Sequence, residues 1–214
     1  PASRVRLIVN GINTAAYITP RPPDSVPGLV KQPGEKWVGT LAGLRAVKNL
    51  PRLVRAFAAL PEDWRLVIVG EGPERETIAA QAEASGVADR VHLPGFAPDP
   101  SRVVGLFNIF ALSSDSEQFP ISVVEAMAAG VAVASPAVGD VAQMVSGDNR
   151  RFVTPAGDEA ALSASLIALA ADEGLRTSVG AANRACAQAA YDEKTMIRAY
   201  RDTYGSALGL AAFP

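Results

Sequence analysis

Two glutamates, Glu117 and Glu125, are separated by seven residues in the stretch SSDSEQFPISVVEAMAAG. The sequence predicts a loop around Glu117, and then a helix that Pro120 opens and that carries Glu125. Carboxylates on either side of a helix N-terminus, whose free N–H groups attract phosphate, suit an elongated, polar, anionic ligand. Spacing alone favours a plainer interpretation, in which one acid belongs to a surface loop and the other to a solvated helix face.

Two cations stand before another predicted helix. Arg45 and Lys48 follow the strand-like run KWVGTL and precede the helix-like run NLPRLVRAFAAL. A lysine can act on a diphosphate as a point charge and an arginine as a forked donor, so the pair could hold two phosphate groups. Solvated basic residues explain the same positions equally well.

Two further loops could contact a ligand. The turn GEGPE at residues 70–74 lacks the GxGxxG spacing of a nicotinamide fingerprint, and ordinary turn glycines are the commoner case. The loop with Gly95 and Phe96 could offer backbone groups and an apolar wall to a nucleobase, although a plain turn with a packed Phe fits as well. His92, just before it, is better interpreted as a partly buried structural residue than as a general base.

Composition limits the classes of protein to consider. A chain of 214 residues that is 49% hydrophobic and 20% charged is expected to form about one well-cored globular domain. Its net charge of −2 argues against a nucleic-acid partner or an anionic membrane surface. A single cysteine, Cys186, excludes an internal disulfide, fits a reducing compartment and, with one histidine, leaves no Cys/His zinc cluster. The apolar runs are too short to span a bilayer.

Strand-like and helix-like segments alternate along most of the chain. Runs such as WRLVIVG and VAVASP are almost continuously apolar, which is typical of strands buried on both faces of a sheet. We therefore predict an α/β fold, a Rossmann-like parallel sheet with helices on both faces. We also expect a strand within residues 1–9, an extended loop at residues 19–35, which hold five prolines, and a short helix at residues 99–107. Two or three C-terminal helices are expected between residues 158 and 208.

Open α/β sheets bind ligands at the carboxyl ends of their strands. Five predicted strand-to-helix loops lie there: residues 41–49, 70–73, 94–99, 113–119 and 135–140. Nearly all the unusual residues fall in these loops, and Gly139 in the last of them would let the backbone bend closely over a ligand. The sequence contains no GxSxG nucleophile elbow and no GxxxxGK[ST] motif, which argues against those two enzyme classes.

Three strings resemble a known family: VGTLAGLRAVKNLPRLVRAFAAL, WRLVIVGEGPE and SDSEQFPISVVEAMAAGVAVASPAVGD. They are similar to retaining glycosyltransferases of the glycogen-synthase-like group 1, family 4, whose GT-B fold places two Rossmann-like domains around a cleft. The likeness is to the C-terminal, nucleotide-sugar-binding domain. The resemblance implies an acceptor-binding domain upstream, and a chain that starts without Met fits this expectation. We expect a linker from that domain at residues 1–34, the donor-binding domain at 35–190, and a C-terminal helix and tail at 191–214.

The resemblance also implies roles for individual residues. Glu125 would accept hydrogen bonds from the donor ribose, Glu117 would contact the transferred sugar, and Lys48 would neutralise the diphosphate. The other implied contacts are Arg45 as a helper on the phosphates, backbone groups near Gln118, Phe119, Pro120 and Ile121 for sugar and phosphate, Gly70 in the glycine turn, and Leu93 to Phe96 beside the base. No metal or other cofactor is implied. The expected location is cytoplasmic, with contact to the inner face of a membrane only through the absent domain.

Four positions depart from the common family pattern and bear on donor contacts: Thr40, Gln118, Asp140 and Gln143 stand where Arg, Gly, Gly and Glu are common. Two other classes would use the same diphosphate cradle. One is a nucleotide-sugar epimerase or phosphorylase of related two-domain build, and the other is a non-catalytic nucleotide-sugar sensor. We expect the isolated domain to transfer little or no sugar, because half of the cleft is contributed by another domain.

Overall fold

A parallel β-sheet forms the centre of the molecule in the computed structural model, which describes residues 5–18 and 21–209. Its six strands follow the order β3-β2-β1-β4-β5-β6, and each neighbouring pair is parallel. The strands are β1 (Lys36–Leu41), β2 (Trp64–Val69), β3 (Val91–Gly95), β4 (Ile109–Ala111), β5 (Ala132–Pro136) and β6 (Val153–Thr154). The predicted α/β fold with a parallel sheet is confirmed.

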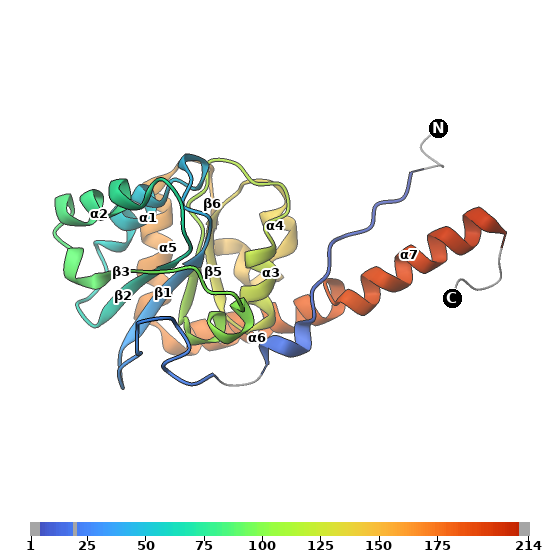
Figure 1. The fold of residues 1–214 in the computed structure, drawn as a ribbon, viewed down its shortest axis with the longest axis horizontal. Helices are drawn as coiled ribbons and strands as arrows, with labels where there is room; N and C mark the ends of the chain where they lie inside the picture. Colours follow the sequence, from blue (N-terminus) through green and yellow to red (C-terminus); the bar gives the residue numbers. More distant parts are fainter. Residues whose placement is uncertain (1–4, 19–20, 210–214) are drawn as a thin grey trace.

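Helices cover both faces of this sheet (Figure 1). The α-helices are α1 (Leu50–Phe57), α2 (Arg75–Ala84), α3 (Ile121–Ala128), α4 (Val141–Met144), α5 (Glu159–Ala171), α6 (Glu173–Ala190) and α7 (Glu193–Leu208). Helices α1, α2 and α5 pack on one face, and α3 and α4 pack on the other. The C-terminal region that the sequence predicted to hold two or three helices contains three, α5 to α7.

Alternation along each strand explains the two core layers. In β4 the side chain of Phe110 joins the layer with α3, while Ile109 and Ala111 join the layer with α1 and α5. All three residues are fully buried. A strand that is covered on both faces has no solvent-exposed face that would carry polar residues, which is why apolar runs in the sequence identified these strands.

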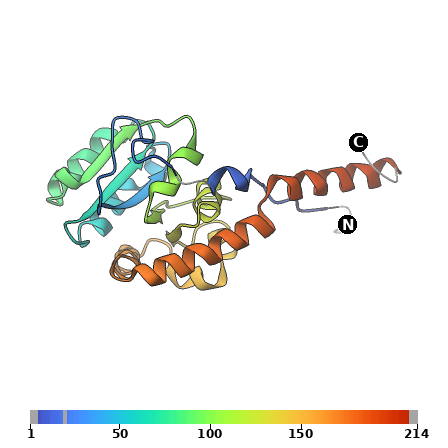
Figure 2. The same cartoon turned by 90° about the horizontal axis from the view of Figure 1, so that it is seen from below.

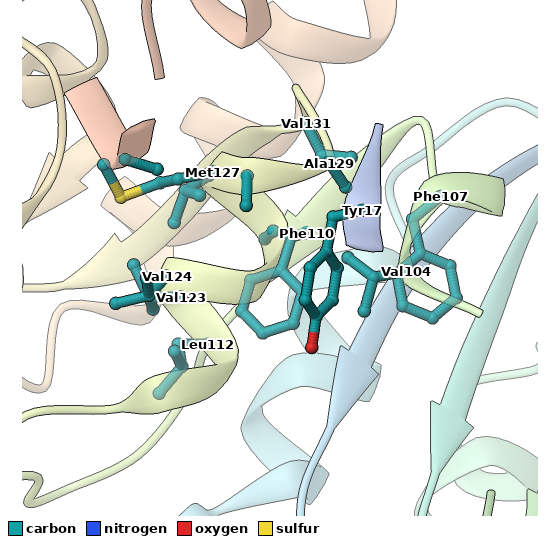
Figure 3. Close-up of a cluster of buried hydrophobic side chains, with 14 of the residues drawn as sticks. Tyr17, Val104, Phe107, Phe110, Leu112, Val123, Val124, Met127, Ala129 and Val131 are labelled. Atoms are coloured by element: carbon teal, nitrogen blue, oxygen red, sulfur yellow. The ribbon is translucent and has the colours of Figure 1, made fainter. Parts of the chain in front are cut away.

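The short helix α3 rests on one of these layers. Figure 3 shows Val123, Val124 and Met127 of this helix in a cluster that also contains Tyr17 and Phe110. Tyr17 belongs to a 3-10 turn, Thr14–Tyr17, which packs against α3 although it lies more than 100 residues away in the chain. The N-terminal segment therefore contributes to the same core as the sheet.

The junction between α6 and α7 anchors that segment. Ile12 forms a parallel bridge with Asp192, its N–H donates to the Tyr191 carbonyl at 2.9 Å, and the Glu193 N–H donates to the Ile12 carbonyl at 2.8 Å. The Thr14 hydroxyl donates to the Asp192 carboxylate. Beyond this junction, α7 extends away from the sheet, and the N-terminal segment leaves on the same side (Figures 1 and 2).

Three local expectations differ from the structure. Pro120 is the N-cap of α3 rather than its first helical residue, with φ −69° and ψ 106°. Residues 5–9 form no strand, because within the described part of the chain they have no partner strand, and residues 1–4 of that expected strand lie outside it. The short helix expected at residues 99–107 is two 3-10 turns, Pro100–Arg102 and Val104–Leu106.

Candidate functional site

The candidate site lies where β1 and β4 meet at the carboxyl edge of the sheet. These strands are neighbours in the sheet but not in the sequence, so the chain reverses its direction of progress across the sheet there. Crevices at such switch points are the usual ligand sites of open α/β sheets. A cavity of about 530 Å³ opens at this edge, lined by the loops after β1, β2 and β3 and by the N-terminal part of α3. Its size suits a small-molecule ligand.

Glycine forms the floor of the cavity between two of these loops. Gly70 has φ +147°, and a Cβ built on it would lie 1.9 Å from the carbonyl oxygen of Ala42. Only glycine allows the loops after β1 and β2 to approach so closely. The Gly70 N–H donates to the Gly95 carbonyl at 2.9 Å, which ties the third loop, carrying Phe96, to the same wall. The sequence identified this turn, and the structure shows the close approach that requires its glycine.

Phe96 and Glu125 stand on different walls of this cavity. Phe96 is 67% exposed, an unusually high value for a phenylalanine, and its ring is free to receive a flat group. Glu125 reaches the cavity from α3 and accepts a hydrogen bond of 2.9 Å from the Tyr17 hydroxyl. Burial raises the pKa of the Glu125 carboxyl above its usual range, and the hydrogen bond from Tyr17 opposes that rise.

The first turn of α3 contributes backbone donors. Its N-cap, Pro120, has no side chain that could accept from the first N–H groups, and no side-chain cap is formed. Ile121 and Ser122 in this turn both line the cavity. An uncapped helix N-terminus at a cavity attracts anions, because its N–H groups and the helix dipole both favour negative charge.

A second, much narrower cavity adjoins the first and shares Leu41, Ala42 and Ser122 with it. It is lined by Lys48 and Glu117, whose Nζ and Oε1 atoms are 2.6 Å apart. These side chains are 26% and 11% exposed, so the ion pair is partly shielded from water. The cavity has room for about one water molecule, with a volume of about 10 Å³.

Local hydrogen bonds hold the lysine and the glutamate in place. Lys48 ends a 3-10 turn, Ala46–Lys48, and Asn49 then adopts a left-handed conformation with φ 42° before α1 begins. The Ser113 hydroxyl donates to the Lys48 carbonyl at 2.9 Å, which links this turn to the loop after β4. Within that loop, the Ser114 hydroxyl donates to Glu117 Oε1 at 2.7 Å. Two loops from adjacent strands are therefore fixed against each other.

A third loop supports the Glu117 loop from the other side. The Asp140 N–H donates to the carbonyl of Gln118 at 2.9 Å, and a Cβ on Gly139 would lie 2.2 Å from that same oxygen. Gly139 has φ +53°. The sequence predicted that Gly139 lets the backbone bend closely over a ligand, whereas here the close approach is to the Gln118 backbone.

The structure places the remaining predicted site residues in different ways. Arg45 is exposed and lines neither cavity, but its Nε lies 3.8 Å from a Cβ built on Gly43, which does line the large one. Leu93 lies in β3, packs against the core and lines neither cavity. Gln118 is exposed, and Phe119 packs edge-on against Tyr191 with ring centroids 5.6 Å apart.

Sequence reasoning missed Tyr17. No periodic signal marks it, because it stands in a single 3-10 turn before the proline-rich loop. His92 lies in β3 and lines neither cavity, and burial lowers its pKa. Among the described residues, no group of three or more metal-ligating side chains is found. No helix in the described ranges has the length and apolar character needed to cross a bilayer.

Known proteins match this chain over much of its length. The family model described as glycosyl transferases group 1 matches residues 24–185. The N-acetyl-alpha-D-glucosaminyl L-malate synthase of Bacillus anthracis is 26% identical over 172 residues, which cover 79% of this chain and 45% of the relative. The D-inositol 3-phosphate glycosyltransferase of Xylanimonas cellulosilytica is 29% identical over 200 residues, 86% of this chain and 47% of the relative. The chain thus spans about half the length of these curated relatives.

Solved structures confirm one half of a GT-B architecture. Anabaena HepE in complex with UDP superposes with a TM-score of 0.85 at 23% identity, over 94% of this chain and 57% of HepE. Sucrose-phosphate synthase from Thermosynechococcus elongatus gives a TM-score of 0.81 at 25% identity, over 94% of this chain and 53% of the synthase. From the match of the family model, the chain belongs to the group 1 glycosyl transferases.

Proposed function

We propose that this chain is the donor-binding half of a retaining glycosyltransferase of family 4. The complete enzyme would move a hexose-type sugar from a nucleoside diphosphate to an acceptor. The observation that carries the proposal is the convergence of Lys48, Glu117 and Glu125 on two adjoining cavities at the switch point of the sheet. HepE, which shares the fold, was crystallised with UDP and with UDP-glucose.

The larger cavity suits the nucleoside. Phe96 offers an exposed ring on which a base can stack, and such stacking is tolerant of base identity. Glu125, on α3, offers carboxylate oxygens to the ribose hydroxyls, because an ionised carboxylate accepts hydrogen bonds without donating any. The glycine at position 70 lets the backbones of the loops after β1 and β2 form the floor of this cavity without an intruding side chain.

The diphosphate would lie where the two cavities join. Lys48 stands on one side of that junction, and the uncapped N-terminus of α3, at Ile121 and Ser122, stands on the other. Arg45 lies beside Gly43, which lines the large cavity, and its side chain would turn toward the phosphates as a second cation. As the glycosidic bond breaks, negative charge grows on the leaving diphosphate, and fixed positive groups there stabilise the transition state.

Glu117 would bind the transferred sugar. Its Oε1 already accepts from Lys48 and from Ser114, so the carboxylate is oriented before a ligand arrives. Backbone groups of Gln118 and Phe119 follow directly and would share in holding the sugar. Because the small cavity admits about one water in this structure, sugar binding requires the Lys48–Glu117 pair to open.

The proposal includes an acceptor domain upstream of residues 1–34, with residues 35–190 as the donor-binding domain and 191–214 as a C-terminal helix and tail. It is supported by the chain covering about half of its relatives. We expect this half alone to bind the donor weakly and to transfer little, since water is not excluded from one side of the cleft. The expected location is cytoplasmic, where the single thiol of Cys186 stays reduced.

A thermal-shift screen of the 214-residue chain tests the proposal. The ligands are UDP, GDP and ADP, each alone and as its glucose conjugate, with EDTA present in a parallel series. At a hundred times its dissociation constant, a ligand that binds only the folded chain adds about 2.7 kcal/mol, which raises Tm by about 5–10 °C for a chain of this size. No shift with any of the six would contradict the proposal.

Two variants assign the roles. Glu125→Ala should weaken the bare nucleoside diphosphate and its sugar conjugate alike, because both carry the ribose. Glu117→Ala should remove the additional affinity that the sugar brings without weakening the binding of the bare nucleoside diphosphate. Equal losses for both ligands in both variants would contradict the assignment of Glu117 to the sugar.

A further inference from the structure

The side chain of Glu125 is held by a residue from outside the sheet. Tyr17, in the Thr14–Tyr17 turn, donates from its hydroxyl to Glu125 Oε1 at 2.9 Å. Within the described ranges, the structure gives the Glu125 carboxylate no other hydrogen-bond donor. Oε2 is therefore the oxygen left for a ligand in the large cavity.

The Tyr17 ring is itself held firmly. It is 9% exposed and packs in the core cluster beside Phe110 and Val104, with its hydroxyl at the far end of the ring (Figure 3). A ring fixed on its faces leaves the hydroxyl little freedom to move, so the oxygen that it bonds to is fixed as well.

The hydroxyl remains a donor at all working pH values. The pKa of Tyr17 is raised far above its ordinary value, mainly by burial. The negative charge of Glu125, its hydrogen bond with Tyr17 and the charge of Asp99 add to this rise. The other acid on the cavity wall, Glu71, is 58% exposed and is 3.9 Å from Arg75, so it is turned toward solvent and a cation. Tyr17 is thus the polar group that acts directly on Glu125.

We propose that Tyr17 is a positioning residue for the nucleotide site, whose hydroxyl holds one oxygen of Glu125 so that the other is presented to a ribose hydroxyl. The inference rests on the proposed function of Glu125. It also gives the N-terminal segment a role in ligand binding, because the turn that carries Tyr17 is anchored at Asp192 in the α6–α7 junction.

The test compares Tyr17→Phe with Tyr191→Phe. Both changes remove one buried hydroxyl and keep the ring in the same core cluster, but the Tyr191 hydroxyl donates to the Met144 carbonyl, at 3.2 Å. Affinities are measured by calorimetry for UDP and for 2′,3′-dideoxy-UDP, which lacks both ribose hydroxyls. Tyr17→Phe should weaken the binding of UDP about tenfold, equivalent to about 1.4 kcal/mol, and leave the affinity for the dideoxy compound nearly unchanged. Tyr191→Phe should alter neither.

A pH series separates positioning from general loosening. The Glu125 carboxylate must be ionised to accept from the ribose, so UDP binding falls as the pH falls through the pKa of Glu125. Loss of the Tyr17 hydrogen bond removes the contribution that lowers that pKa. In Tyr17→Phe the fall in UDP binding should therefore begin at a higher pH than in the parent chain. An unchanged pH profile together with unchanged UDP affinity would overturn the proposal.

An NMR measurement on the parent chain guards against a variant that does not fold. With Cζ-labelled tyrosine, the four tyrosines give four signals, and only that of Tyr17 should titrate with Glu125. Glu125→Gln should abolish this titration, and its persistence there would refute the contact. If the parent chain binds neither UDP, GDP nor ADP, the proposed function fails and the inference fails with it. Nucleotide binding without preference for the ribose hydroxyls refutes the inference and the ribose role of Glu125, and it leaves the proposed donor-binding function standing.

Discussion

Removing the charge of Lys48 should weaken the binding of a bare nucleoside diphosphate, while removing the charge of Glu117 should strengthen it. The opposite signs follow from the ion pair between them. With Nζ and Oε1 2.6 Å apart, Glu117 neutralises Lys48 in the ligand-free chain, so a diphosphate must compete with it for the lysine. Glu117→Gln releases the lysine, and Lys48→Met removes it.

The structure sets the size of both effects. A hydrogen bond from a charged donor to an ionised acceptor contributes about 1.5–3 kcal/mol, so Lys48→Met should weaken UDP by about 10- to 150-fold. The pair that Glu117→Gln breaks is 26% and 11% exposed, and it is worth about 1 kcal/mol at the upper end of the range for accessible pairs. Glu117→Gln should therefore tighten UDP by about fivefold, while reducing the extra affinity of the sugar conjugate.

Stability provides an independent readout of the same pair. In Lys48→Met the Glu117 carboxylate, only 11% exposed, retains Ser114 as its donor but loses its cation. We expect a loss of about 2 kcal/mol, which is about 4–8 °C in Tm for a chain of this size. The double variant Lys48→Met/Glu117→Gln should recover part of this loss, because the uncompensated charge is gone.

The assay is isothermal calorimetry with UDP, accompanied by thermal unfolding of each variant. Lys36→Met is the matched control: Lys36 and Asp63 form an ion pair of 2.7 Å at the opposite edge of the sheet, where β1 begins. It should leave UDP affinity unchanged. If Glu117→Gln weakened bare UDP as much as Lys48→Met does, the competition between glutamate and diphosphate for the lysine would be refuted.

Two further changes test the site's backbone and its buried acid. Gly70→Ala should lower the free energy of unfolding by more than about 2 kcal/mol and abolish nucleotide binding, because the new Cβ would lie 1.9 Å from the Ala42 carbonyl oxygen. Gly86→Ala is the control: its Cβ would meet open space, but φ is +68°, so chemical denaturation should show a loss of about 1–2 kcal/mol. Glu125→Gln should stabilise the chain by about 0.5–2 kcal/mol at pH 8 and less at pH 4. The sign follows because burial raises the pKa of Glu125 in the folded chain. Ionisation of Glu125 therefore reduces stability progressively as the pH rises from its unfolded-state pKa to its folded-state pKa, and the full penalty applies above the folded-state pKa. Equal differences in Tm between variant and parent at both pH values would contradict this reasoning.

The sheet and the chain order of its strands were largely predictable because burial on both faces leaves a strong signal. Runs such as that of β2 are apolar throughout, and alternation with helices requires parallel pairing. The start of α3 was displaced by one residue, since the fixed φ of Pro120 suits both an N-cap and a first helical position. The strand expected within residues 1–9 is absent from the described residues 5–9, because apolar residue types do not reveal whether a partner strand is within reach.

The site was predictable to the extent that it lies on loops at the carboxyl edge. Lys48, Glu117 and Glu125 come from loops and a helix that follow β1 and β4, and the parallel topology brings those strand ends together. Pairing between particular side chains was not predictable. Whether the Lys48 ammonium points toward a phosphate-binding position or toward Glu117 depends on side-chain geometry, and the spacing of residues along the chain does not determine that geometry.

Tyr17 shows that the N-terminal segment is part of the fold around the candidate site. Tyr17 and Val26 are 9% and 1% exposed and lie in the same core cluster as α3, so residues before β1 contribute to the fold that carries the site. Their anchor at Asp192 joins the same segment to the start of α7. A shift of α7 relative to the sheet would therefore pull on the turn that carries Tyr17 and, through its hydroxyl, on Glu125. The proposed nucleotide site is therefore coupled to the part of the chain that leaves the sheet, through the Tyr17–Glu125 hydrogen bond and through the packing of the Thr14–Tyr17 turn on α3.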